Sequence, residues 1–369
     1  MGEFIDGSGK SMSGLWLFCR AGFESDCAAE IQDKASQLGV YGYCQAKAGE
    51  AFVVFRCQAE EAEHLASKLP LKELIFTRQW LVILAEMDLP AEGDRVSPIL
   101  TCVAENQQRL GLLGELTVTT PDTNEAKSVA GFTKKFTVPL RQALRGASLL
   151  SQKPLAKRPS LQVVFINKVR VVVGFSFSFN QAPWAGGIPR LRMPGDAPSR
   201  STLKLDEAFS VFVAKEEHEQ RLQSGLRAVD LGAAPGGWTY QLVRRGMMVT
   251  AVDNGPMAES LMDTGQVSHV REDGFRYLPK KRNVHWLVCD MVEKPARVGE
   301  LMTEWLLQDY CKEAIFNLKL PMKQRYLAVN EYLQHIKEQL QNEGHGRFEL
   351  QAKQLYHDRE EVTVHARWL

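Results

Sequence analysis

The chain has 369 residues, typical of two or three domains, with 44% hydrophobic residues for packed cores and a net charge of only +1. It contains no run of about 18 apolar residues and no signal-peptide pattern, so the sequence predicts no membrane span and no export. Its seven cysteines are dispersed, without Cys-x-x-Cys or Cys/His zinc spacing, which argues against a disulfide framework or a zinc site and favours a cytoplasmic protein.

Residues 12–95 are expected to form a ferredoxin-like α+β domain, preceded by an expression leader at residues 1–11. Apolar periodicity predicts a strand, a helix, a hairpin and a second helix, and this β-α-β-β-α order suits a split βαβ unit. A further apolar run closes the domain. The expected elements lie at 15–19, 24–38, 41–46, 51–57, 60–68 and 76–84.

Residues 96–180 are expected to form a second α+β module. A long helix at 125–144 contains Pro139, which should kink the helix or split it in two. The module resembles the THUMP domain, an RNA-binding unit found beside RNA-modifying domains, in its element order and its basic character. The other expected elements are a helix at 97–110, a strand at 115–119 and a hairpin of 161–166 with 170–179.

Positive charge is concentrated in residues 126–204, which hold fourteen lysines and arginines and one acid, Asp196. This stretch carries +13, so the rest of the chain carries −12. Such a segment predicts a surface for a polyanion such as RNA, and the alternative is a solvated face balanced by acidic neighbours. A basic linker rich in proline and glycine is expected at 181–200. The candidate RNA-binding residues are Lys127, Lys134, Lys135, Arg141, Arg145, Arg190, Arg192 and Arg200.

Residues 201–369 alternate strands with helices, which predicts a mostly parallel seven-stranded sheet covered on both faces. The last two strands form a hairpin and leave one strand antiparallel. This arrangement is the mark of the Rossmann-like methyltransferase fold. The strands are expected at 227–232, 248–253, 268–272, 284–290, 313–319, 347–355 and 361–367.

A glycine-rich loop follows the first of these strands, in Ala-Val-Asp-Leu-Gly-Ala-Ala-Pro-Gly-Gly-Trp-Thr at 228–239. Its glycines let a ligand approach the backbone between a strand and a helix N-terminus. The loop matches neither Gly-x-Gly-x-x-Gly nor a P-loop. It resembles motif I of the S-adenosylmethionine (SAM) methyltransferases, and the alternative is a turn in another α/β domain. The resemblance implies cofactor binding by Ser201, Gly232, Ala234, Pro235, Gly236, Gly237, Trp238, Asp253, Asp273 and Asp290.

Four further segments resemble the catalytic tetrad of FtsJ-like ribose 2′-O-methyltransferases. The resemblance assigns the tetrad to Lys204, Asp290, Lys319 and Glu361, with Lys319 as proton acceptor. A ribose hydroxyl must lose its proton as it attacks a methyl group, and a lysine can take the proton only when it is neutral. A nearby cation such as Lys204 favours the neutral form, whereas the two acids oppose it. The alternative is a pair of surface salt bridges.

From Met12 onward the chain resembles the ribosomal RNA large subunit methyltransferase M (RlmM) family. The resemblance rests on Lys-Phe-Thr-Val-Pro-Leu-Arg, Asp-Asn-Gly-Pro-Met and Gln-Leu-Tyr-His-Asp-Arg-Glu-Glu-Val-Thr-Val. It implies SAM-dependent 2′-O-methylation of a cytidine in protein-free 23S rRNA by a monomer that needs no metal. Ala234 stands where the family has cysteine. The alternatives are methylation of another RNA such as tRNA, or an RNA-binding protein with a relic SAM fold.

Overall fold

The computed structural model describes residues 12–369, which form two compact units that meet in the chain between Ile188 and Pro189. The expected leader, residues 1–11, lies outside the described residues. Each unit is built on one seven-stranded sheet. Over the described part of the chain, no helix is both long and apolar enough to cross a membrane.

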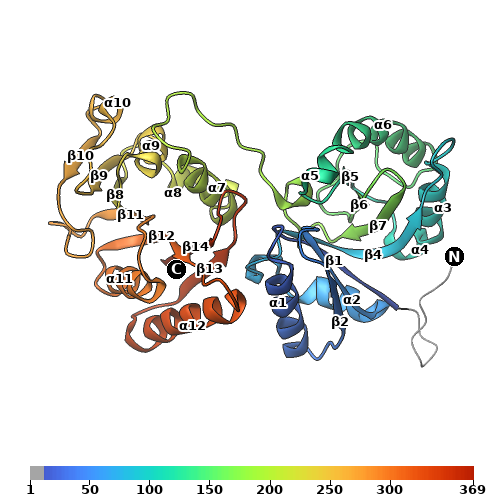
Figure 1. The fold of residues 1–369 in the computed structure, drawn as a ribbon, viewed down its shortest axis with the longest axis horizontal. Coiled ribbons are helices and arrows are strands. Elements are labelled where there is room, and N and C mark those ends of the chain that lie inside the picture. The colour runs from blue at the N-terminus through green and yellow to red at the C-terminus, as the bar shows by residue number, and fades with distance from the viewer. Residues whose placement is uncertain (1–11) are drawn as a thin grey trace. The chain divides into compact units, whose positions relative to one another are not determined.

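The N-terminal unit contains a mixed sheet in the order β2-β3-β1-β4-β7-β6-β5 (Figure 1). Neighbouring strands run antiparallel except β5 and β6, which are parallel. The pairing of β4 with β7 joins the two expected N-terminal modules into one continuous sheet. The strands are β1 (Met12–Phe18), β2 (Tyr43–Ala46), β3 (Phe52–Gln58), β4 (Gln79–Asp88), β5 (Glu115–Thr119), β6 (Ser160–Phe165) and β7 (Arg170–Ser176).

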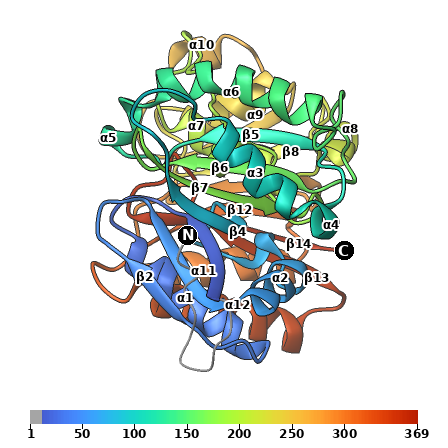
Figure 2. The ribbon, with the colours of Figure 1, turned by 90° about the vertical axis from the view of Figure 1, so that its right-hand side faces the viewer.

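The helices of this unit pack against one face of the sheet (Figure 2). Phe165 contacts Phe132 and Phe136 edge to face, with ring centroids 5.3 and 5.2 Å apart. On the same face, Cys44 donates a hydrogen bond to the carbonyl of Ala28. Because side chains alternate along a strand, the neighbouring residues point to the other face of the sheet. The helices are α1 (Glu24–Gln37), α2 (Ala59–Lys68), α3 (Ser97–Glu105), α4 (Gln107–Leu110), α5 (Asn124–Lys127) and α6 (Ala130–Gly146).

The helix expected at 125–144 is interrupted, but not at Pro139. The break falls between α5 and α6, and Pro139 lies inside α6. Phe136, Leu140 and Leu144 bury one side of α6. This tertiary packing offsets the backbone hydrogen bond that proline cannot donate, so the prediction of a split at Pro139 is wrong. The strand expected at 170–179 is also shorter, because β7 ends at Ser176.

The C-terminal unit contains a sheet in the order β10-β9-β8-β11-β12-β14-β13. All strands are parallel except β14, which is antiparallel to both β12 and β13. The predicted mostly parallel sheet with one antiparallel strand is confirmed. The strands are β8 (Arg227–Leu231), β9 (Met248–Val252), β10 (Val267–Val270), β11 (Val284–Cys289), β12 (Cys311–Lys319), β13 (Phe348–Lys353) and β14 (Glu361–Trp368).

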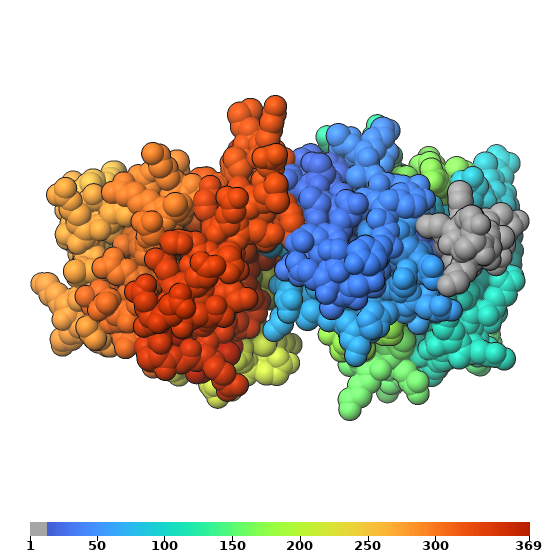
Figure 3. Space-filling view, turned by 90° about the horizontal axis from the view of Figure 1, so that it is seen from below, coloured from blue at the N-terminus to red at the C-terminus, as the bar shows by residue number. Residues whose placement is uncertain are grey.

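Helices cover both faces of this sheet. On one face, Phe209, Trp238 and Leu242 pack with strand residues such as Trp286 and Ile315 in the main core cluster. On the other face, α11 contacts β12 and α12. Figure 3 shows α12, in red, at the surface of this unit. The helices are α7 (Thr202–Phe212), α8 (His218–Arg221), α9 (Gly237–Arg244), α10 (Glu259–Met262), α11 (Pro295–Leu307) and α12 (Arg325–Glu343).

Candidate active site

The glycine-rich loop lies between β8 and α9, as the sequence predicts. Gly232 and Gly236 have φ angles of +78° and +116°, in the left-handed region that favours glycine. A Cβ atom at Gly232 would collide with Met291, and one at Gly236 with Leu261. The loop therefore requires glycine at both positions, for conformation and for space.

A cavity of about 520 Å³ opens beside this loop at the carboxyl ends of β8, β9 and β11. In open α/β sheets, ligands bind at this edge. Asp253 supports the cavity wall: its carboxylate accepts hydrogen bonds from the amides of Ala234, at 3.0 Å, and Gly255, at 2.7 Å. The predicted cofactor residues that line the cavity are Gly232, Ala234, Asp253, Asp273 and Asp290.

The other predicted cofactor residues lie on the loop, at the start of α9 or, for Ser201, just before α7, and they do not line this cavity. Trp238 is buried in the core with 2% exposure, so its side chain is a packing element. The carbonyl of Pro235 accepts a hydrogen bond from the amide of Ala258. Ser201 lies against Gly237, so closely that a Cβ atom added at Gly237 would collide with the Ser201 hydroxyl. Gly236 and Gly237 begin α9.

The four residues of the predicted tetrad lie together. The ammonium of Lys204, on α7, is 3.2 Å from Asp290 Oδ2 and 2.5 Å from Glu361 Oε1. The other oxygen of Glu361 pairs with the ammonium of Lys319. Lys319 and Glu361 are directly opposite each other in the β12–β14 ladder. Asp290 also lines the cavity, so the charged cluster and the cavity are contiguous.

Burial and charge act in opposite directions at this cluster. Burial disfavours the charged form of Lys204, but the carboxylates of Asp290 and Glu361 outweigh it and raise its pKa above the ordinary value. Burial likewise opposes ionisation of Glu361, but the two lysines lower its pKa below the ordinary value. The charged form of Lys204 and the ionised form of Glu361 are therefore both favoured, and the Glu361 carboxylate lies between the nitrogens of the two lysines.

A buried chain of hydrogen bonds, absent from the sequence-based prediction, lies behind the tetrad. Asn317 donates to Asp290 Oδ1 at 2.7 Å, and the Asn317 carbonyl accepts from Thr363 at 2.8 Å. The Thr363 hydroxyl also lies 2.9 and 3.1 Å from the carboxyl oxygens of Asp358. Burial, reinforced by the negative charges of Glu361 and Glu207, raises the pKa of Asp358 well above its ordinary value.

Strand alternation is the signal that could have revealed this network. Asn317 precedes Lys319 by two positions and Thr363 follows Glu361 by two, so each points to the same side of the sheet as its tetrad neighbour. The network orients Asp290 from behind. Asp358 lies in the turn before β14, and local sequence offers no signal for its burial.

Replacing Thr363 with valine is expected to destabilise the C-terminal unit by about 1–3 kcal/mol, because the buried Asp358 and Asn317 each lose a hydrogen-bond partner. Denaturant unfolding measures this change. Thr303→Val is the matched control, since the buried Thr303 hydroxyl donates, among residues 12–369, to the Gly299 carbonyl within its own helix alone. Equal losses of stability in the two variants would contradict the role of the network.

The predicted RNA-binding residues are distributed over both units. Lys127, Lys134 and Lys135 are exposed on α5 and α6. Arg141 and Arg145 are half-buried, and each donates to a backbone carbonyl, of Leu116 and Ser151 respectively. The predicted RNA-binding residues of the C-terminal unit, Arg190, Arg192 and Arg200, are all exposed.

The Arg190 guanidinium packs over the ring of Tyr356, 5.4 Å from the ring centroid.

Within residues 12–369, no cluster of three or more His, Cys, Asp or Glu side chains is arranged to hold a metal ion.

Three family models match the chain. Residues 12–81 match the RlmM ferredoxin-like domain, residues 94–177 the N-terminal model of ribosomal RNA large subunit methyltransferase M, and residues 197–344 the FtsJ-like methyltransferase model.

Among the curated proteins that match nearly the whole chain are two that carry the name ribosomal RNA large subunit methyltransferase M. The protein from Idiomarina loihiensis is 64% identical over 369 residues, which is 100% of this chain and 99% of the relative. The protein from Shewanella sp. strain ANA-3 is 57% identical over 358 residues, which is 96% of this chain and 97% of the relative. Among solved structures, TrmN from Thermus thermophilus aligns over 97% of this chain and 100% of its own, with 13% identity and a TM-score of 0.35, too low to support a conclusion.

Proposed function

The chain belongs to the ribosomal RNA large subunit methyltransferase M family, and we propose that it methylates the ribose 2′-hydroxyl of a cytidine in 23S rRNA. The observation that carries this proposal is the position of Asp290. Its carboxylate lines the cavity beside the glycine-rich loop and also pairs with Lys204 in the tetrad. A methyl donor in that cavity would therefore lie next to the two lysines.

The lining of the cavity suits SAM in its chemistry. Gly232 lines the cavity without a side chain, and each Asp253 oxygen keeps capacity to accept a further hydrogen bond, as a ribose would require. SAM supplies the methyl group when bound. Gly232, Ala234 and Asp253 would hold SAM. Asp273, whose carboxylate is half-exposed at the same edge, would face the adenine base of SAM.

The tetrad residues have distinct tasks in this proposal. Lys204 stays charged because of its raised pKa, and it holds Asp290 and Glu361 in place. Lys319, whose side chain is 34% exposed, is the lysine accessible to a substrate and accepts the proton of the 2′-hydroxyl. Glu361 orients Lys319 through the contact between its carboxylate and the Lys319 side-chain nitrogen. The hydrogen bond from Asn317 to Asp290 keeps the other end of the cluster fixed.

The test is transfer of a labelled methyl group from SAM to three acceptors: protein-free 23S rRNA, tRNA and assembled ribosomal subunits. Mapping of the modified nucleotide then identifies the position and the atom. We expect label on a cytidine ribose of protein-free 23S rRNA. Label on tRNA alone would contradict the proposed substrate, and RNA binding without any transfer would favour a relic SAM fold.

The exposed lysines of α6 are expected to contact RNA phosphates. The double variant Lys134→Glu/Lys135→Glu should weaken RNA binding and lower the slope of log K against log salt by about 0.7–0.9 for each phosphate that the protein no longer neutralises. Filter binding over a series of salt concentrations measures both quantities. Lys337→Glu, an exposed lysine on α12, is the control, and an unchanged slope in the double variant would exclude α6 from the RNA surface.

A further inference from the structure

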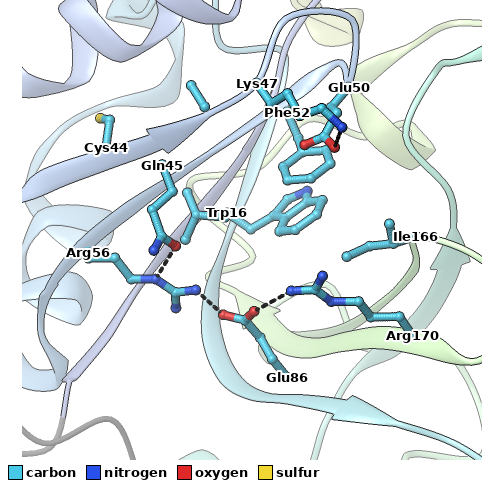
Figure 4. A pocket seen from close by; sticks show the side chains of 12 residues that line it. Trp16, Cys44, Gln45, Lys47, Glu50, Phe52, Arg56, Glu86, Ile166 and Arg170 are labelled. Atoms are coloured by element: carbon cyan, nitrogen blue, oxygen red, sulfur yellow. Dashed lines mark hydrogen bonds and ion pairs between the residues drawn. The ribbon is translucent and has the colours of Figure 1, made fainter.

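The sheet of the N-terminal unit carries a second cavity, of about 420 Å³, on the face opposite its helices (Figure 4). This volume falls within the roughly 300–1,000 Å³ range of ligand pockets. Its walls come from strands β1, β2, β3, β4 and β7, with Trp16, Phe52, Arg56, Glu86 and Arg170 among the lining residues. Neither the tetrad nor the glycine-rich loop belongs to this unit, so this cavity is a separate feature.

Two stacked aromatic rings form one side of the cavity. The rings of Trp16 and Phe52 lie 3.8 Å apart between centroids, with an interplanar angle of 17°. Trp16 is only 1% exposed, yet its indole nitrogen has no hydrogen-bond partner among residues 12–369. In Figure 4 this nitrogen is at the edge of the ring that points toward Glu50 and Ile166. A buried donor without a partner is unfavourable, and an acceptor on a ligand would satisfy it.

Cations predominate at the rim of the cavity. Glu86 pairs with both Arg56 and Arg170, and Arg56 also donates to Gln45 at 2.9 Å. The contact from Arg170 to Glu86 is long, at 3.8 Å, and the Arg170 side chain is 57% exposed. One carboxylate shared by two guanidinium groups leaves a net positive charge. Arg170 can therefore bind an anion without breaking a strong ion pair.

We propose that this cavity binds an unpaired nucleotide of the RNA substrate. The base stacks on the face of Phe52 that is turned away from Trp16, an oxygen of the adjoining ribose or phosphate accepts the Trp16 N–H, and a neighbouring phosphate pairs with Arg170. An aromatic face, an unpartnered donor and an exposed arginine are the features by which proteins bind single-stranded RNA. This inference rests on the proposed function, because it takes RNA as the substrate, and it assigns part of substrate recognition to the N-terminal sheet.

Fluorescence anisotropy of the full chain with two labelled single-stranded RNA decamers tests the proposal. One decamer carries bases and the other is abasic with the same charge. The unmodified protein should bind the decamer with bases more tightly. Phe52→Ala should weaken that binding about 5- to 150-fold, as expected when a base–aromatic stack is removed, and should bind the two decamers equally. Phe52→Leu retains apolar volume over Trp16 and should show the same loss if stacking is the cause.

Arg170→Ala should weaken binding of both decamers and reduce the salt slope by about 0.7, the value of one phosphate on a single strand. The controls are Tyr41→Ala, an aromatic residue 74% exposed outside the cavity, and Lys68→Ala, an exposed lysine on α2. Neither control should change the binding.

Methyl transfer to protein-free 23S rRNA, measured in parallel, separates this inference from the proposed function. A protein that methylates 23S rRNA but binds both decamers equally overturns the inference alone. A protein that methylates no RNA contradicts the proposed function. The variants at Phe52 should raise KM for 23S rRNA and leave kcat unchanged, because the cavity binds substrate and takes no part in proton transfer. A lowered kcat with unchanged KM would also overturn the inference.

Discussion

Replacing Lys319 with alanine is expected to lower kcat for methyl transfer by about 10²- to 10⁴-fold, the contribution typical of a positioned general base. Affinity for SAM and for RNA should change little, because Lys319 contacts only Glu361 within the cluster and does not line the cavity. Single-turnover transfer from labelled SAM measures the rate, and equilibrium binding of each ligand measures the affinities.

Two further variants separate the basicity of Lys319 from its charge. Lys319→Arg keeps a cation beside Glu361, but a guanidinium does not release its proton at neutral pH, so this variant should be as slow as the alanine variant. Lys323→Ala, an exposed lysine four residues further along the chain, should retain full activity. A fully active Lys319→Arg would show that a positive charge, rather than a proton acceptor, is required.

Replacing Glu313 with alanine is expected to destabilise the C-terminal unit by about 3–5 kcal/mol, the cost of leaving a buried charge without its partner. Glu313 accepts hydrogen bonds from the guanidinium of Arg221, at 2.9 and 3.1 Å from Nε. His285 and His365 lie 3.2 and 3.1 Å from the same carboxylate. Its loss leaves Arg221, with 6% exposure, paired with the carboxylate of the half-exposed Glu217 and 3.1 Å from Nε2 of His365.

Denaturant unfolding measures this loss, and Glu360→Ala is the matched control. Glu360 pairs with Arg325 at 3.3 Å, but its side chain is 64% exposed, so its removal should change stability by less than about 1 kcal/mol. A similar change in the two variants would contradict the buried pair as a stabilising element.

The same pair predicts a pH dependence of stability. Burial opposes ionisation of Glu313, but hydrogen bonds from His285, His365 and Arg221 lower its pKa well below the ordinary value of 4.5. A carboxyl group with a lowered folded-state pKa stabilises the protein fully above its unfolded-state pKa, and this stabilisation declines as the pH falls below that value. The stability difference between the unmodified chain and Glu313→Ala should therefore be constant from pH 7 to about 5.5 and shrink in more acidic solution. A difference that grows on acidification would contradict the assignment.

Local sequence was sufficient for the strands of the C-terminal sheet, whose positions follow from short apolar runs separated by helical periodicity. It was also sufficient to predict that Asp253, Asp273 and Asp290 lie at one edge, because the carboxyl ends of parallel strands converge there. The requirement for glycine at 232 and 236 follows from the loop motif. In each case the physical cause acts over a few neighbouring residues, so it leaves a pattern in the chain.

Packing between distant segments decided the rest. Pro139 remains inside α6 because the sheet holds the buried side of that helix, a contribution that helix propensity does not contain. The pKa of Asp358 is raised by burial and by the nearby Glu361 and Glu207, which lie on β14 and α7, and Thr363 joins it to Asn317 only through the β12–β14 register. The unpartnered N–H of Trp16 likewise depends on which strands lie beside β1. Residues close together in the chain specified the elements and the chemical types at the site, whereas burial, strand register and hydrogen-bond partners arose only in the folded molecule, because they depend on residues far apart in the chain.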